Sequence, residues 1–257
     1  MKTASALLLV LTAGAGCAPR RQVVMGDCRS WNGASVCGWG EKLGDSLVSF
    51  GATVPMKAID QSPAEMTMTW PPVAEAIVPL PEAVGSATGF KSLTIFWEPH
   101  GHPPGPYLTP HYDFHFNTMT GAEIDSITCA DSTKPPQLPA AYVLPDAALP
   151  QVGMLIGLCV PKMGMHALPA AEMTGTAPFQ KTIVVGYYHR APMFVEPMIA
   201  RATLLGKQPF SISVPDVPGR PAGTRYPTRF RADYDSTAQS YRFVFEGLGA
   251  GAGAGAK

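Results

Sequence analysis

Proline and glycine interrupt this sequence so often that long helices have little room to form. The chain has 27 prolines and 26 glycines among 257 residues, spread over its whole length. Proline removes a backbone donor and glycine weakens helices, so such frequent interruption favours short strands joined by turns. Most of the strand candidates are rich in Val, Ile, Phe, Tyr and Thr. The clearest of them are Ser92–Trp97, His111–Thr118, Thr182–Tyr188, Met193–Ile199 and Ser240–Phe245.

Helical patterns are few. Ala140–Leu149 and Ile199–Leu205 could each form about two turns, and Tyr188–Pro192 is typical of a hairpin connection between two strands. We therefore predict a mainly β fold: a single-domain β-sandwich or barrel-like fold with short helices and long proline-rich loops. Residues 18–246 would form this one domain, followed by a disordered Gly/Ala tail at residues 247–257.

The N-terminus has the pattern of a secretory signal over residues 1–17. A positive start at Met1-Lys2 precedes the short apolar run Ala4–Ala13 and then small residues around Gly14. Cys17 stands where a lipoprotein carries its acylated cysteine, but Gly14 occupies the position where Leu, Val or Ile is usual. The small residues also suit an ordinary signal peptidase. The chain is thus predicted to be exported, to the periplasm or outer surface, either free or lipid-anchored at Cys17.

Four cysteines remain after Cys17, and an even number in an oxidising compartment predicts two disulfides. We favour Cys28–Cys37 and Cys129–Cys159, because each closes one local loop. The second would pin the proline-rich excursion Asp131–Ala148. A cysteine-ligated metal is disfavoured, because no two cysteines have Cys-x-x-Cys spacing.

Charge and motifs exclude several classes of function. The formal net charge is zero and no basic stripe is visible, which argues against a nucleic-acid partner. No second hydrophobic segment is long enough to cross a membrane, so membrane contact would come only through a lipid anchor. No nucleophile elbow, phosphate loop or nucleotide-binding motif is present. The sequence leaves a homo-oligomer open.

Five of the six histidines lie between His100 and His166. The centre of this cluster is Pro110–Phe116, in which polar and aromatic residues alternate. In a strand, the polar residues His111, Asp113 and His115 would share one face, and the aromatic residues between them would point to the core. Positions four apart in a straight strand are separated by roughly 13 Å, near the limit for two ligands of one ion. Either the strand bends, or one histidine binds the ion and the other acts nearby, with Asp113 orienting an imidazole.

Three further residues extend the predicted site. His102 lies in a turn-rich loop, His166 follows a glycine turn, and Glu196 is a carboxylate within an apolar strand. Neutral imidazole is the commonest metal ligand, and a buried carboxylate needs a metal or a hydrogen-bond partner. His189, in the hairpin turn, is predicted to be exposed, and His100 could belong to either group. We predict one transition-metal ion (Zn, Cu, Fe or Mn) held by His102, His111, His115, His166 and Glu196, with Asp113 and Glu196 as candidate catalytic residues.

These segments resemble an exported bacterial family of unknown function. Its pattern runs Gly-His-x-Pro-Pro-Gly-x-Tyr, Pro-His-Phe-Asp-Phe-His-Phe-Tyr, Met-Gly-x-His-Trp and Tyr-Glu-Pro-Met. The likeness covers about Leu93 to Leu205, and the chain departs from the pattern at His100, Asn117 and Ala167. The resemblance implies a mainly β fold in which the six predicted site residues form one constellation. It implies no firm activity.

Three functions remain compatible with such a site, beside a hydrogen-bonded polar core without a metal. The first is a metal-dependent enzyme acting on a small molecule through an open coordination position. The second is copper binding without turnover, for which the methionines in Met66-Thr67-Met68 and Met163-Gly164-Met165 would suit Cu(I), although core packing explains them as well. The third is a structural or assembly protein that uses a closed ion site to hold loops together.

Overall fold

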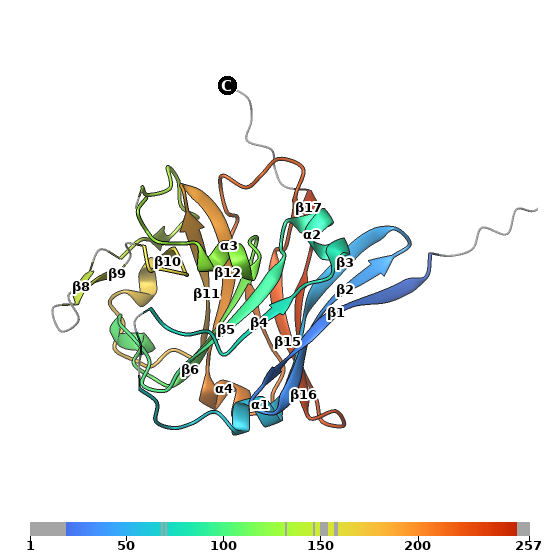
Figure 1. The fold of residues 1–257 in the computed structure, drawn as a ribbon, viewed down its shortest axis with the longest axis horizontal. Coiled ribbons are helices and arrows are strands. Elements are labelled where there is room, and N and C mark those ends of the chain that lie inside the picture. The colour runs from blue at the N-terminus through green and yellow to red at the C-terminus, as the bar shows by residue number, and fades with distance from the viewer. Residues whose placement is uncertain are drawn as a thin grey trace, which may run out of the picture.

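Two antiparallel β-sheets packed face to face make up most of the molecule (Figure 1), so the predicted mainly β fold is confirmed as a sandwich and not a closed barrel. The computed structural model describes residues 19–67, 69, 71–131, 133–145, 147–149, 154–156 and 159–250. The predicted signal segment and the last seven residues of the predicted tail lie outside this description. None of the described helices has both the length and the apolar character needed to cross a bilayer.

The first sheet has six strands in the order β1-β2-β3-β16-β15-β13. These strands are β1 (Arg21–Trp31), β2 (Ala34–Leu43), β3 (Ser46–Pro55), β16 (Ser240–Glu246), β15 (Arg229–Asp235) and β13 (Phe210–Ser213). The sequence predicted β16 but not the three N-terminal strands, and most of β1 is exposed and lacks an apolar stripe. Cys28 and Cys37 are register partners on β1 and β2, and their predicted disulfide is confirmed.

The second sheet has seven strands in the order β4-β5-β6-β12-β11-β10-β7. These strands are β4 (Ala76–Pro79), β5 (Ser92–Glu98), β6 (His111–Asn117), β12 (Ala191–Ala200), β11 (Lys181–Tyr188), β10 (Met165–Pro169) and β7 (Tyr142–Val143). Four of them, β5, β6, β11 and β12, confirm predicted strands. The predicted hairpin between β11 and β12 is also confirmed, and it turns at His189 and Arg190, which both have left-handed backbone conformation.

The remaining elements are short. The helical ones are α1 (Met56–Asp60), α2 (Glu82–Thr88), α3 (Gly121–Asp125), α4 (Arg201–Leu205), and the 3-10 helices η1 (Gly105–Tyr107) and η2 (Ala170–Glu172). Two small ribbons pair β8 (Ala147–Leu149) with β9 (Met154–Ile156), and β14 (Arg225–Tyr226) with β17 (Gly249–Ala250).

These elements correct two predictions and confirm part of a third. The helix predicted over Ala140–Leu149 is wrong, because its described residues contain β7 and β8, with Pro145 between them. The second predicted helix is shorter than expected and begins only at Arg201. The start of the Gly/Ala tail is not disordered: β17 pairs with β14, and the Arg225 guanidinium donates a hydrogen bond to the carbonyl of Leu248 at 2.9 Å.

The main core lies between the sheets, and the aromatic face of β6 is part of it. Tyr112, Phe114 and Phe116 are fully buried. The Phe114 ring packs edge-on against Phe243 of β16 at 4.9 Å, and Phe116 packs in the same way against Phe245 at 4.8 Å. Burial of each such ring stabilises the fold by roughly 1.5–3 kcal/mol. The aromatic face predicted for this strand is thus confirmed.

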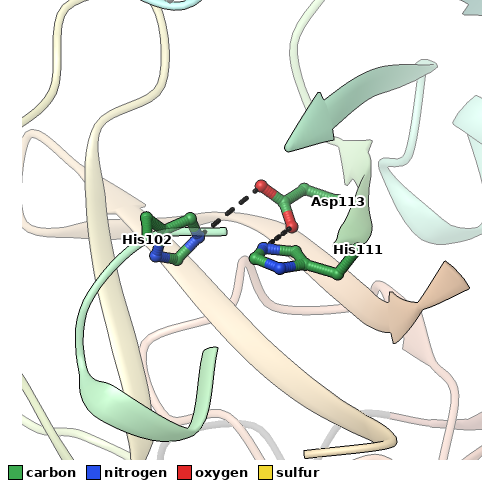
Figure 2. A group of neighbouring side chains, drawn as sticks. All are labelled: His102, His111 and Asp113. Carbon is green, nitrogen blue, oxygen red and sulfur yellow. Dashed lines mark ion pairs between the residues drawn. The ribbon is translucent and has the colours of Figure 1, made fainter. Parts of the chain in front are cut away.

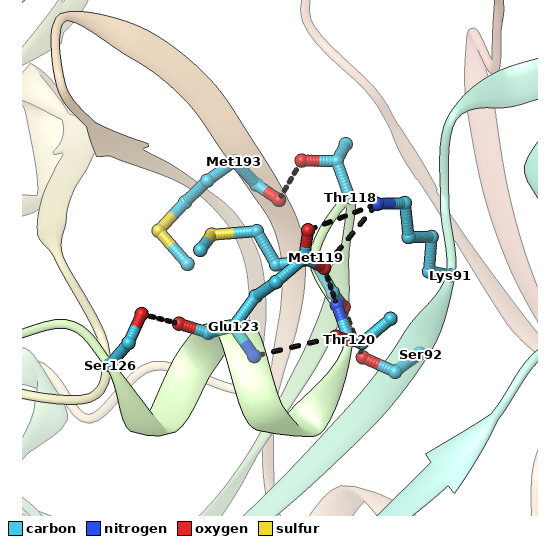
Figure 3. A network of polar contacts seen from close by, with 8 residues as sticks. All are labelled: Lys91, Ser92, Thr118, Met119, Thr120, Glu123, Ser126 and Met193. Atoms are coloured by element: carbon cyan, nitrogen blue, oxygen red, sulfur yellow. Dashed lines mark hydrogen bonds and ion pairs between the residues drawn. The ribbon is translucent and has the colours of Figure 1, made fainter.

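Hydrogen bonds at the end of β6 hold the strand in position (Figure 3). The Thr118 hydroxyl donates to the carbonyl of Met193, in β12, at 3.0 Å. Thr120 then caps α3: its hydroxyl accepts from the Glu123 amide at 3.4 Å, and the Glu123 carboxylate accepts from the Thr120 amide at 2.6 Å. This reciprocal cap satisfies two backbone donors that a helix start leaves free. The side chains on β6 are therefore presented from a fixed strand.

Candidate metal centre

The outer face of β6 carries the polar residues that the alternation predicted. His111, Asp113 and His115 are 0%, 5% and 2% exposed, and they point away from the core between the sheets. They are buried because loops and a second apolar cluster, which includes Tyr107, Phe194 and Met198, pack on this face. Three alternate positions of like orientation on a central strand thus present nitrogen and oxygen atoms to a mostly buried space.

Neighbouring strands bring two carboxylates to the same face. On β5, Glu98 is the register partner of His111. On β12, the register that pairs Val195 with Phe116 places Glu196 opposite His115. Glu98 and Glu196 are 4% and 1% exposed. Acidic side chains are rarely buried unless they are paired, so this face has unusual chemistry.

His102, His111 and Asp113 form the first triad (Figure 2). One nitrogen or oxygen atom from each lies within 4.8 Å of the others. The two oxygens of Asp113 face different imidazoles, with Oδ1 3.2 Å from Nε2 of His111 and Oδ2 3.8 Å from Nε2 of His102. The opposite ring nitrogens lie near backbone carbonyls, at 2.8 Å from Pro103 for His102 and 2.7 Å from Thr109 for His111. Such anchoring of Nδ1–H directs a lone pair on Nε2 into the triad, as is usual for metal-binding histidines.

Gly101 sets the position of His102. Its φ is +65°, and a Cβ there would lie 2.0 Å from the carbonyl oxygen of Tyr107. That carbonyl accepts the backbone N–H of His102 at 3.2 Å. Only glycine permits both the left-handed conformation and the close approach of the two backbone segments. The loop can therefore hold His102 beside the sheet because position 101 has no side chain.

His115, His166 and Glu196 form the second triad, again with ligand atoms within 4.8 Å of one another. Nε2 of His115 lies 3.4 Å from Oε2 of Glu196, and the two side chains are 3% and 2% exposed. His166 approaches from β10, and its ring centroid is 5.5 Å from that of His115. All three residues come from strands of the sheet.

Phe194 and Gly186 shape the floor of the second triad. The Phe194 ring lies flat against His115, with centroids 4.2 Å apart and planes at 9°, and it contacts His166 edge-on at 5.1 Å. Gly186, on β11, is the register partner of Phe194 on β12 and of His166 on β10. A Cβ at Gly186 would lie 1.9 Å from the Phe194 ring. Because Gly186 has no Cβ, the Phe194 ring can lie in this space, in contact with both His115 and His166.

Charges differ between the triads. Burial lowers the pKa of His102, but the nearby carboxylate of Asp113 outweighs it and raises that pKa to about 9. Burial likewise tends to raise the pKa of Asp113, but the nearby imidazoles of His111 and His102 hold it well below its usual range. With no ion bound, the first triad is therefore an ion pair at neutral pH.

The second triad is neutral under the same conditions. Burial lowers the pKa of His115 to about 4, and burial together with the neighbouring His115 lowers that of His166 to about 3. Burial, and then the charge of Asp113, raise the pKa of Glu196 well above its usual range. Two neutral imidazoles and a protonated carboxyl face one another there.

Several buried polar atoms of the site have no hydrogen-bond partner among the residues that the structure describes. They are Glu98 Oε2, His111 Nε2, Asp113 Oδ1, His115 Nε2 and Glu196 Oε2. Each such group costs about 1–3 kcal/mol if nothing compensates it. The imidazole and carboxylate atoms of each triad approach one another without hydrogen-bond geometry, as ligands around a common ion do. The donor set of each triad fits a transition metal such as zinc or iron.

The structure brings all six predicted site residues to one face but distributes them over two triads. His111 and His115 need not reach one ion, because each belongs to a different triad and β6 pairs regularly with β5 across both. The triads adjoin, because Asp113 of the first and His115 of the second lie two positions apart on the same face of β6. Asp113, expected beside the metal, is a member of the first triad, and Glu196 is a member of the second.

Glu98 is the member of this face that sequence reasoning missed. Burial raises its pKa to about 7, and the charge of Asp113 adds to that rise. If the predicted strand Ser92–Trp97 had been extended by one residue, the alternation of side chains would have placed Glu98 on the same face as Phe96. That is the face on which the triads lie. By contrast, His100 and His189 lie away from both triads. Their side chains are 54% and 61% exposed, in ion pairs with Glu65 and Asp131, so the predicted exposure of His189 is confirmed.

Comparisons with protein family models, with curated proteins and with solved structures each gave no match to this chain.

Proposed function

We propose that this is an exported metal-binding protein whose two triads each bind one transition-metal ion, and that the paired ions form the centre of a metal-dependent enzyme acting on a small molecule. The observation that carries this proposal is the set of unpartnered buried atoms, since four of them belong to the triads and face one another. Bound ions would complete the contacts that these atoms lack.

The two separate donor sets support two ions in place of the single ion that the sequence suggested, and the charge of the site is compatible with both. Asp113, Glu196 and Glu98 place three carboxyl groups near one another in a buried space. When all three are ionised, one divalent ion leaves a single negative charge and two leave a single positive charge, so a second ion is compatible with the charge of this space. Paired ions that share a carboxylate-rich space are a recurrent arrangement in hydrolytic and phosphoryl-transfer enzymes.

The first triad supports catalysis more than the second. Each triad supplies two histidines and one carboxylate, a set that leaves coordination positions open for water or substrate. His102 is 39% exposed, so a ligand can approach the first triad, whereas His115 and Glu196 of the second are almost fully buried. The first ion would activate water or polarise a substrate oxygen, and the second would hold charge and geometry.

Copper binding without turnover has less support. Met165, beside His166, packs into the core between the sheets, on the opposite side of β10. Both triads consist of nitrogen and oxygen donors, which suit Zn, Fe or Mn better than Cu(I). Met68 lies outside the described residues.

Export is the part of the proposal that rests on the disulfides. Cys28–Cys37 and Cys129–Cys159 both form as predicted, and such bonds persist in oxidising compartments. The predicted signal segment and Cys17 are outside the described residues. Fractionation of cells with mass analysis of the mature N-terminus would distinguish a free form from one that is lipid-anchored at Cys17.

Metal analysis of matched variants tests the centre. After reconstitution with Zn²⁺, Fe²⁺ or Mn²⁺, we expect about two equivalents in the wild type, about one in His102→Ala or His166→Ala, and none in a His111→Ala/His115→Ala double variant. His100→Ala and His189→Ala are the controls and should keep both ions. Circular dichroism confirms that each variant is folded. A folded wild type that binds none of these ions would contradict the proposal and leave a polar core.

A further inference from the structure

A pocket of about 100 Å³ lies beside the two triads, over the outer face of β5. Its volume is enough for several water molecules or a small organic molecule. It is lined by Met66, Thr67, Thr69, Pro72, Val73, Phe96, Trp97 and Glu98. The walls are mostly apolar, with two threonines and one carboxyl group as polar elements. Apolar walls with a few placed polar groups are typical of small-molecule sites.

Glu98 is the feature that distinguishes this pocket from a packing defect. Its side chain is 4% exposed, and Oε2 has no hydrogen-bond partner among the described residues. No lysine or arginine is among the described residues that line the pocket. A buried carboxyl oxygen without a partner is costly, and a ligand that donates a hydrogen bond would remove that cost.

The floor of the pocket is continuous with the triads. Glu98 is the register partner of His111, and Phe96 is the register partner of Asp113. The Phe96 ring also contacts the imidazole of His115, with centroids 5.0 Å apart. Glu98 belongs to neither triad, so its unpartnered oxygen is not needed as a ligand to close either one.

We propose that this pocket binds a small molecule that has an apolar body of a few carbon atoms and an amino or hydroxyl group that donates a hydrogen bond to Glu98. The assignment of this molecule as the substrate of the metal centre rests on the proposed function. The binding itself depends on the pocket and on Glu98. Glu98 thus orients the bound molecule, and Phe96 separates it from the second triad.

Three probes of similar size test the pocket: n-butylamine, n-butanol and methyl propyl ether, which cannot donate a hydrogen bond. Saturation-transfer NMR on the metal-loaded full chain should show binding of the amine and the alcohol but not of the ether. Glu98→Gln should weaken binding of the amine at least about tenfold, because it removes the charge. Val73→Trp should abolish binding, because Val73 is 70% exposed at the pocket and can carry a bulky ring over it.

Val23→Trp, at an exposed position on β1, is the matched control and should bind the probes as the wild type does. The proposal is overturned if no probe binds the wild type, or if Glu98→Gln and Val73→Trp both bind the amine as tightly as the wild type does. Metal content is measured on the same samples. Two bound ions with no probe binding would overturn this inference alone. Probe binding that depends on Glu98 in a chain that binds no metal would support the pocket and contradict the proposed function.

Discussion

The two triads contain the same kinds of side chain, two imidazoles and one carboxyl, in different surroundings. The first takes His102 from a loop and leaves it 39% exposed, whereas the second is built from strands, with two of its side chains at most 3% exposed. Without an ion, the first is an ion pair, because Asp113 raises the pKa of His102, and the second is neutral, because burial lowers the pKa of its histidines. Identical donors can thus form one accessible and one enclosed site, and the surroundings decide which.

Removal of the disulfide Cys129–Cys159 should have the largest effect, and this effect should differ between the two triads. The disulfide closes a loop of 30 residues, and Cys159 directly precedes Val160, which pairs with Gly164 just before His166. Cys129→Ser/Cys159→Ser should lower the free energy of unfolding by about 3 to 4 kcal/mol. It should also weaken metal binding at the second triad more than at the first. Denaturant titration and metal competition measure both effects, and equal weakening of the two sites would contradict the distinction.

The pH dependence of the metal-free protein should have contributions of opposite sign from His115 in the second triad and His102 in the first. The folded pKa of His115, about 4, lies below its unfolded value, so this residue favours folding at pH above 6.5, and that stability is lost as the pH falls toward 4. The loss should reach about 3 kcal/mol. The folded pKa of His102 is raised to about 9, so its contribution is present below pH 6.5 and is lost as the pH rises through 9.

Because His102 is partly exposed, water screens its interaction and its effect should be the smaller one. Urea unfolding of the metal-free chain between pH 4 and 10 measures both slopes. His115→Gln should reduce the acid slope without removing it, because burial also lowers the pKa of His166, to about 3, and His102→Gln should reduce the alkaline slope. An acid slope that persists unchanged in His115→Gln would assign it to other groups.

Two glycine substitutions should disable one triad each. Gly186→Ala forces a Cβ into the Phe194 ring, and Gly101→Ala forces one against the carbonyl of Tyr107 at a left-handed φ. Each should cost about 1–3 kcal/mol, the usual range for overpacking or backbone strain. We expect Gly186→Ala to lose the second ion and Gly101→Ala the first, as measured by metal content. Gly223→Ala is a control, because it also has a left-handed φ but its Cβ would meet nothing within 4 Å.

The smallest effect should come from His100. Its exposed ion pair with Glu65 lies outside both triads, so His100→Ala should change the free energy of unfolding by less than about 0.5 kcal/mol. Metal content should stay that of the wild type. Loss of an ion in this variant would mean that the first triad extends along the loop, and calorimetry of metal binding would detect it.

The sequence predicted what depends on local periodicity. Alternation over His111–Phe116 assigned the polar and aromatic faces of β6, and the strands on either side were found because they are apolar and β-branched. Both disulfides followed from the preference for closing short loops. The strand β1 was missed because its mostly exposed residues have no apolar stripe.

What the sequence could not predict depends on which strands are neighbours. The division into two triads requires Glu196 opposite His115, and His166 reaching past Gly186, across strands far apart in sequence. The pairing of Glu98 with His111 likewise appears only once β5 and β6 are in register. Local periodicity identifies the face of the sheet on which a side chain lies. It does not identify the side chains of other strands that contact that side chain.

One face of β6 packs in the core and the other carries residues of the triads. The length of this strand therefore cannot change without loss of one or the other. Inserting or deleting one residue within His111–Asn117 would exchange the two sets of side chains and place charged groups between the sheets. Related chains with the same centre should therefore vary in length only in the connecting loops. Chains that retain the aromatic alternation of this strand but replace its polar residues would keep the sandwich and lose the chemistry.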